Sequence, residues 1–99
     1  MPLSSGQRKF LKSEAHHLEP LVLLGKQGVT DTLVRSVAEN LAAHELIKVR
    51  FNEFKAEKKV LSEDIAFRTG AEVVSIIGHV CTLYKQHPEA EHRQIELPD

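Results

Sequence analysis

The stretch Leu21–Thr32 constrains the fold of this chain more than any other part of the sequence. It opens with the aliphatic run Leu21–Leu24 and continues through a glycine loop, Gly25-Lys26-Gln27-Gly28. A short, wholly apolar run is typical of a strand buried on both faces. Thr30 can cap a following helix, and Asp31 would favour the positive end of its dipole. We therefore predict a buried strand, a glycine loop and the start of a helix.

The glycine loop is suited to contact with a negatively charged oxygen. Glycines let another backbone approach closely because they have no Cβ, and the first amides of the next helix lack intrahelical partners. Lys26 adds a mobile positive charge. Loops of the form Gly-x-x-Gly clamp nucleic-acid backbones in some RNA-binding modules. The same pattern also makes a plain tight turn into a helix, so the loop alone leaves both interpretations open.

Composition indicates one domain with an acidic end. The chain has 99 residues, of which 41% are hydrophobic and 27% charged, as in ordinary globular domains. No apolar run has the length of a signal peptide or membrane span, and one cysteine cannot form an internal disulfide, so we expect a cytoplasmic protein. Residues 86–99 carry four acids against Arg93 alone, whereas the rest of the chain has two more cations than acids. We expect a single domain over residues 1–85 and an acidic, mobile tail over residues 86–99, in which residues 93–97 could return as a short strand.

Hydrophobic periodicity and capping residues predict three helices and four strands. Ser4 and Gln7 have capping-box spacing, Gly70 is placed to cap the third helix, and Gly78-His79 is typical of a type II′ hairpin turn. The expected helices are residues 5–17, residues 31–43 and a third that ends near residue 69, and the expected strands are residues 21–24, 46–51, 72–77 and 80–84. Right-handed crossovers would make the first three strands parallel and the hairpin would make the fourth antiparallel. The order α-β-α-β-α-β-β therefore predicts an α/β (α+β) two-layer sandwich, with the helices on one face of a four-stranded mixed sheet.

Basic side chains accompany two of these elements. Arg8, Lys9 and Lys12 lie mostly opposite the apolar stripe of the first helix. Lys48 and Arg50 alternate with apolar residues in the second strand, so the face of the sheet that carries them should be open to water. Either set is an ordinary solvated surface or part of a site for an anionic partner. The third helix is expected to bury Val60, Leu61, Ile65 and either Ala66 or Phe67.

Catalytic and metal-binding interpretations find little support in the residues. Cys81 lies in a predicted strand and is expected to be a small core side chain rather than a nucleophile. His16 and His17 would point about 100° apart on a helix, and no Cys or carboxylate stands at zinc-ligand spacing. His44 is expected to end the second helix. We expect no enzyme activity, no metal or other cofactor, and no small-molecule substrate.

Four separated segments, taken together, indicate a resemblance to a known family. They are residues 21–30 (LVLLGKQGVT), residues 44–49 (HELIKV), residues 69–78 (TGAEVVSIIG) and residues 95–98 (IELP). In this order they resemble the CRM domain family in its bacterial stand-alone form, the YhbY-like proteins. The resemblance implies a fold similar to the C-terminal domain of translation initiation factor 3, with sheet order 1-2-4-3 and the fourth strand antiparallel.

The resemblance also implies RNA binding and, for the bacterial members, association with precursors of the large ribosomal subunit. By this analogy the glycine loop corresponds to the family's RNA-contacting loop. One departure is His79, where relatives commonly carry lysine. If the hairpin touches RNA, the charge of His79 would depend on pH, because an unperturbed histidine titrates near 6.5.

We therefore expect the chain to dock on ribosomal RNA during assembly of the large subunit. The candidate RNA-binding residues are Gly25, Lys26, Gln27, Gly28, Thr30, Arg8, Lys9, Lys12, Lys48 and Arg50. Most of the aromatic residues are expected to be buried, so recognition should depend on shape and phosphate contacts more than on base stacking. These aromatic residues are Phe10, Phe51, Phe54, Phe67 and Tyr84. A module that binds an acidic protein surface stays open as the alternative, and no membrane partner is expected.

Overall fold

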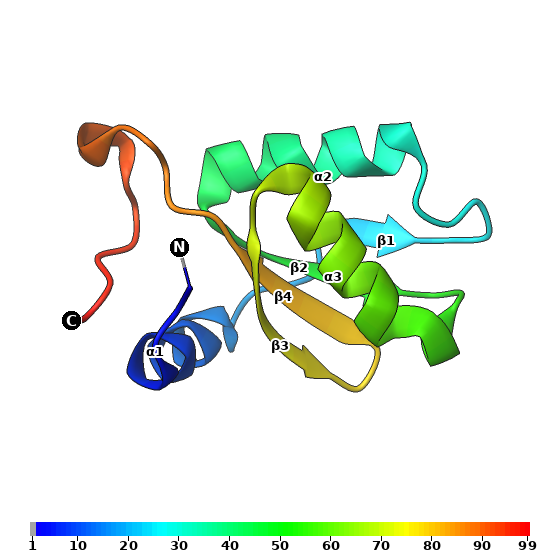
Figure 1. The fold of residues 1–99 in the computed structure, drawn as a ribbon, viewed down its shortest axis with the longest axis horizontal. Helices are drawn as coiled ribbons and strands as arrows, with labels where there is room; N and C mark the ends of the chain where they lie inside the picture. Colours follow the sequence, from blue (N-terminus) through cyan, green and yellow to red (C-terminus); the bar gives the residue numbers. More distant parts are fainter. Residues whose placement is uncertain (1) are drawn as a thin grey trace.

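The helices and strands follow one another in the predicted order (Figure 1). A computed structural model describes residues 2–99. Its helices are α1 (Ser5–Ala15), α2 (Asp31–His44) and α3 (Lys58–Thr69), and its strands are β1 (Val22–Leu24), β2 (Leu46–Phe51), β3 (Glu72–Ile77) and β4 (Val80–Tyr84), with short 3-10 turns η1 (Lys55–Glu57) and η2 (Ala90–His92). The boundaries stated from the sequence agree with these to within two residues. Within residues 2–99, no helix has the length and apolar character needed to cross a membrane.

Local hydrogen bonds explain where the elements begin and end. The Ser4 hydroxyl accepts from the Gln7 amide at 3.1 Å while the Ser4 amide donates to the Gln7 side chain at 3.0 Å, which confirms the capping box at the start of α1. The Thr30 hydroxyl accepts from the Leu33 amide at 3.0 Å and caps α2. Gly70 has φ 75° and ends α3 in the left-handed region, where glycine has no steric penalty. The capping signals in the sequence therefore identify the starts of α1 and α2 and the end of α3.

The four strands form one mixed sheet in the order β1-β2-β4-β3. β1 pairs with β2 in parallel, and β4 is antiparallel to both β2 and β3. The first three strands consequently run the same way and end at the same edge of the sheet. This arrangement confirms the predicted fold class, sheet order and direction of the fourth strand.

The helices lie on both faces of the sheet, which corrects the prediction that they share one face. The larger core cluster joins α2 and α3 to side chains such as Ile47 and Leu83, whereas the smaller one joins Leu11 of α1 to Leu46 and Tyr84. Neighbouring residues of a strand point to opposite faces, so α1 packs on the face opposite α2 and α3 (Figure 1). The crossover rule concerns helices that connect parallel strands. It therefore constrained α2 and α3 but not α1, which precedes the first strand.

Several apolar residues expected in the core are exposed. Leu23 is 58% exposed, so β1 is buried on one face only, because α1 covers only part of that side of the sheet. On α3, Val60 is 71% exposed, against the prediction. Ile65 and Ala66 face the core as predicted, and Phe67, the alternative to Ala66, is 88% exposed. Phe54 is also exposed, and only Phe51 and Tyr84 among the aromatic residues are fully buried. Phe10 is half-buried against the smaller core cluster, so Phe54 and Phe67 are the two aromatic residues that contradict the expected burial.

The C-terminal segment folds back onto the domain. The Glu45 carboxylate is buried and accepts hydrogen bonds from three backbone amides, those of His87 at 2.7 Å, Gln94 at 2.6 Å and Ile95 at 2.9 Å. Ile95 and Leu97 pack against the smaller core cluster. Residues 93–97 form no strand, and the amides of Gln94 and Ile95 donate to this side chain rather than to a neighbouring strand. The acidic segment lies beside α1, at the end of the molecule opposite the glycine loop (Figure 1).

Replacing Glu45 by alanine should lower the free energy of unfolding by about 1–3 kcal/mol, because three amides lose their acceptor. Amide exchange should also accelerate at residues 87, 94 and 95. Urea denaturation and native-state hydrogen exchange measure the two effects. Glu91→Ala removes an exposed carboxylate of the same segment and should change stability by no more than about 0.5 kcal/mol. Equal effects of the two substitutions would show that Glu45 does not hold the segment.

Candidate functional site

Three connecting segments gather at the edge of the sheet where β1, β2 and β3 end. They are the glycine loop with Thr30, the segment 52–57, and the turn Gly78-His79 (Figure 1). The Asn52 and Glu53 amides both donate to the Leu24 carbonyl, at 3.0 and 3.3 Å, and so tie the second segment to the first. The Phe51 amide donates to the His79 carbonyl at 2.7 Å and so connects the end of β2 to the hairpin turn. Open sheets flanked by helices commonly bind their ligands outside such strand ends.

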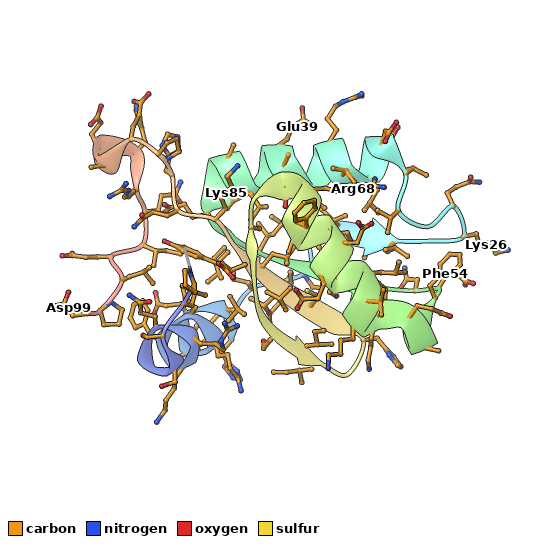
Figure 2. All side chains as sticks on the ribbon, viewed as in Figure 1. Lys26, Glu39, Phe54, Arg68, Lys85 and Asp99 are labelled. Carbon is orange, nitrogen blue, oxygen red and sulfur yellow. The ribbon has the colours of Figure 1, made fainter. Side chains whose placement is uncertain are left out.

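The glycine loop presents its central side chains to solvent. The Gly28 amide donates to the Gly25 carbonyl at 3.0 Å and closes a tight turn, with Lys26 and Gln27 exposed at its tip. Figure 2 shows Lys26 extending from this tip away from the body of the protein. Gly28 has φ 73°, so a glycine is needed there for backbone reasons. A Cβ added to Gly25 would meet no atom within 4 Å, so this position is open.

The helix that follows the loop contributes less positive potential than its position suggests. Thr30 uses its hydroxyl to cap the Leu33 amide. Asp31 lies in the first turn of α2 and is exposed, so its carboxylate already offsets part of the helix dipole. The positive charge of this loop therefore comes mainly from Lys26.

A cluster of cations surrounds the hairpin turn at the same edge. The Lys58 ammonium donates to the Gly78 carbonyl. Desolvation, and then the charges of Lys58, Lys55 and Arg50, lower the pKa of the His79 imidazole below its ordinary value. The imidazole of His79 therefore gains its charge at a lower pH than an ordinary histidine. The sequence singled out Arg50 and His79 but missed Lys55 and Lys58, whose position next to the hairpin depends on the packing of α3 against β3.

The face of the sheet that α1 leaves open carries a row of side chains from all four strands. Leu23 pairs with Arg50, Arg50 with Val80, and Val80 with Ile77. Arg50, Leu23 and Ile77 of this row are exposed, whereas Lys48, one row further from the loop, is half-buried. The face predicted to be basic and open to water is so only in part, because α1 covers part of it and the apolar side chains of Leu23 and Ile77 are exposed in the same row as Arg50. Arg50 consequently lies near the glycine loop, and Lys48 lies closer to α1.

The basic residues of α1 lie away from the glycine loop. The Arg8 side chain has a structural role, since its guanidinium donates to the Val73 and Val74 carbonyls of β3. Lys9 and Lys12 are exposed and line a shallow groove that also includes Ile77. Figure 1 shows α1 and the glycine loop toward opposite ends of the long axis, which measures 38 Å. The predicted residues thus fall into two groups, connected across the sheet by the row from Ile77 to Leu23.

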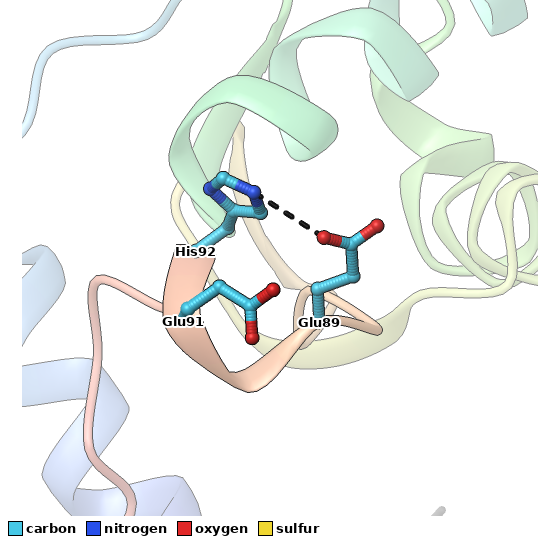
Figure 3. A group of neighbouring side chains, drawn as sticks. All are labelled: Glu89, Glu91 and His92. Carbon is cyan, nitrogen blue, oxygen red and sulfur yellow. Dashed lines mark ion pairs between the residues drawn. The ribbon is translucent and has the colours of Figure 1, made fainter.

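Two other groups of reactive side chains lie outside this edge. Cys81 is buried, and burial raises the pKa of its thiol to about 11, as expected for a core residue rather than a nucleophile. Figure 3 shows Glu89, Glu91 and His92 close together at η2, with His92 Nε2 3.3 Å from a Glu89 oxygen. All three side chains are exposed. Surface groups of this kind are common without a metal ion, and the sequence analysis did not single them out.

If the hairpin contacts RNA, lowering the pH should strengthen binding through His79. Its pKa lies below 6.5, so the side chain gains its charge only as the pH falls through the range below that value. Between pH 7.5 and pH 5.5 the affinity should rise about two- to fourfold more in the wild type than in His79→Gln, the increment of one phosphate contact. His79→Lys should not show this additional rise in affinity and should bind RNA more tightly than the wild type at pH 7.5. Fluorescence anisotropy at fixed ionic strength measures the difference, and identical profiles for wild type and His79→Gln would remove His79 from the interface.

Comparison with known proteins places the chain among relatives of similar length. It is 39% identical over 97 residues to Probable RNA-binding protein YqeI of Bacillus subtilis (strain 168), a match that covers 97% of this chain and 99% of the relative. It is 40% identical to an RNA-binding protein of Haemophilus influenzae, covering 97% and 95% of the two chains.

A solved structure has the same fold. The solution structure of SAV1595 from Staphylococcus aureus matches with a TM-score of 0.81 and 33% sequence identity, over 98% of this chain and 100% of the other. The CRS1/YhbY (CRM) domain matches residues 3–85. These residues include all helices and strands of the sheet sandwich and all three segments at the strand ends. The chain therefore belongs to the CRS1/YhbY (CRM) domain family.

Proposed function

We propose that this protein binds RNA at the edge of the sheet where β1, β2 and β3 end. The proposal depends most on one observation: an exposed glycine loop and a cationic hairpin cluster lie at the same edge, fixed to each other by backbone hydrogen bonds. Lys26, Lys55 and Lys58 would contact phosphates from this edge. The bacterial relatives are named as a probable RNA-binding protein and an RNA-binding protein, and these names support the same partner.

The binding groups suit a phosphate backbone more than a particular base sequence. Lysine and arginine side chains supply point charges and forked donors, and Gly25 leaves room for close approach. Phosphate contacts fix the position and orientation of a protein on RNA without reading its sequence. The exposed row through Arg50 would extend the contact across the sheet toward Lys9 and Lys12, which form a second, more distant group.

The partner we propose is ribosomal RNA within precursors of the large ribosomal subunit, in the cytoplasm. This part of the proposal depends on the resemblance to the bacterial stand-alone CRM proteins. A binding role fits the side chains better than a catalytic one, because the single thiol is buried and protonated. The acidic C-terminal segment lies at the other end of the molecule and would not cover the proposed edge.

Salt-dependent binding and sedimentation test the two parts separately. Affinity for large-subunit RNA fragments should fall linearly with salt on a log–log plot, with a slope of about −2 to −4 if three to five phosphates are contacted. In cell extracts the protein should sediment with precursors of the large subunit rather than with mature ribosomes. Absence of RNA binding at low salt would contradict the proposal and favour an acidic protein partner. RNA binding without cosedimentation would remove only the ribosomal assignment.

A further inference from the structure

Phe54 is an exposed aromatic residue placed directly against the glycine loop. It is 43% exposed, although a phenyl side chain gains free energy when it is buried. A Cβ built on Gly28 would lie 3.4 Å from Phe54 Cε2 and 3.7 Å from Cζ. The edge of the ring therefore contacts the glycine, and much of the side chain is left open to solvent. Figure 2 shows Phe54 and Lys26 at the same end of the molecule.

The backbone holds Phe54 in this place. The residue has φ 56° and ψ 37°, a left-handed conformation that is uncommon outside glycine and asparagine. Its carbonyl accepts from the Glu57 amide at 3.0 Å, and the two residues before it are bound to the Leu24 carbonyl. The ring is thus positioned by hydrogen bonds on both sides of it and is part of a defined surface.

The surroundings of the ring suit a nucleotide. Lys26 and Lys55 are exposed in the two segments that meet at the ring, and the carboxylates of Glu53 and Glu57 lie in the same segment as Phe54. Cations and acids alternate there, so the apolar ring face is the part of this surface that water solvates least well. A flat, uncharged aromatic surface beside phosphate-binding cations is the arrangement on which unpaired bases stack in proteins that bind single strands.

We propose that Phe54 is a stacking platform for an unpaired nucleobase whose adjoining phosphate contacts the glycine loop. The inference depends on the proposed function and narrows it, because the RNA at this edge must then offer a bulged, looped or single-stranded nucleotide. It also replaces the expectation, drawn from the sequence, that base stacking is minor. Gly28 leaves space beside the ring, since a Cβ there would be in van der Waals contact with it.

The test compares two RNAs, each with the wild type and three variants. One RNA is a hairpin with a single bulged 2-aminopurine, and the other is the same hairpin fully paired. Phe54→Leu keeps an apolar side chain but removes the aromatic face, Phe54→Trp keeps an aromatic face, and Phe67→Leu is the matched control at a phenylalanine that is 88% exposed on α3. Binding is measured by anisotropy and stacking by quenching of 2-aminopurine fluorescence.

We expect wild type to quench the bulged base and to prefer the bulged RNA. Phe54→Leu should bind the bulged RNA about five- to a hundredfold more weakly, without quenching, and the paired RNA as wild type does. Phe54→Trp should retain both properties, and Phe67→Leu should behave as wild type. The wild-type quenching measurement stands even if a variant fails to fold.

Three outcomes would overturn the inference, and they are distinguishable. Equal losses on both RNAs would make Phe54 a support for the loop, while RNA binding itself would stand. Unchanged binding and quenching in Phe54→Leu would also leave the proposed function intact and remove the stacking role. Failure of the wild type to bind either RNA at low salt would contradict the proposed function together with the inference.

Discussion

Replacing Lys26, Lys55 and Lys58 together by glutamine is expected to weaken RNA binding roughly fiftyfold near 0.15 M salt. Each lost single-strand phosphate contact removes about 0.7 from the log–log salt slope, so three contacts should make the slope shallower by about two. Lys26 and Lys55 are exposed, and Lys58 bonds only the Gly78 carbonyl among the described residues. The fold should therefore tolerate the change, which thermal unfolding can confirm.

The matched control for these three lysines is the pair on α1. Lys9→Gln with Lys12→Gln removes exposed cations from the groove beside Ile77, away from the glycine loop. The double variant should lose only a fewfold in affinity. If it loses more than the triple variant, the principal RNA surface is α1 and the proposed edge is wrong.

The two glycines of the loop are expected to respond differently to substitution by leucine. Gly28 has φ 73° and the Phe54 ring against it, so Gly28→Leu should lower the free energy of unfolding by about 1–3 kcal/mol. Gly25 lies outside the left-handed region and faces open space. Gly25→Leu should change stability by less than about 0.5 kcal/mol but weaken RNA binding at least tenfold, because the side chain would occupy the approach to the loop.

Urea denaturation and anisotropy separate the structural glycine from the one that leaves room for a ligand. A larger residue can replace a loop glycine without backbone strain only where the φ angle is negative. Gly28 does not meet this condition. If Gly25→Leu binds RNA as wild type does, close approach at the loop plays no part in recognition.

Local signals in the sequence predicted the strands and most of the helix ends. The capping pairs at Ser4 and Thr30 and the glycine at position 70 each act within one turn of helix, so their neighbours in sequence are also their partners in space. The sheet order depended on the family resemblance and on the handedness of crossovers. Neither the resemblance nor the handedness of crossovers fixed the position of α1, because α1 does not connect two strands.

The surface was harder to predict because it depends on contacts between distant segments. Lys58 approaches the hairpin only once α3 has packed on β3, and Phe54 meets Gly28 only once the ends of β1 and β2 are side by side. The buried carboxylate of Glu45 bonds amides about fifty residues further along the chain. In the sequence, Phe54 and Lys58 belong to a charge-rich stretch that looks like ordinary solvated surface.

The most direct test of the proposed surface is a titration of the nitrogen-15-labelled protein with a large-subunit RNA fragment, followed by amide chemical shifts. The largest changes are predicted in residues 25–30, 52–58 and 78–79, with smaller ones along the row through Arg50. Residues 87–95 should be unaffected, since they lie at the other end of the molecule. Saturable shifts confined to the outer faces of α2 and α3, with none at the strand ends, would contradict the account.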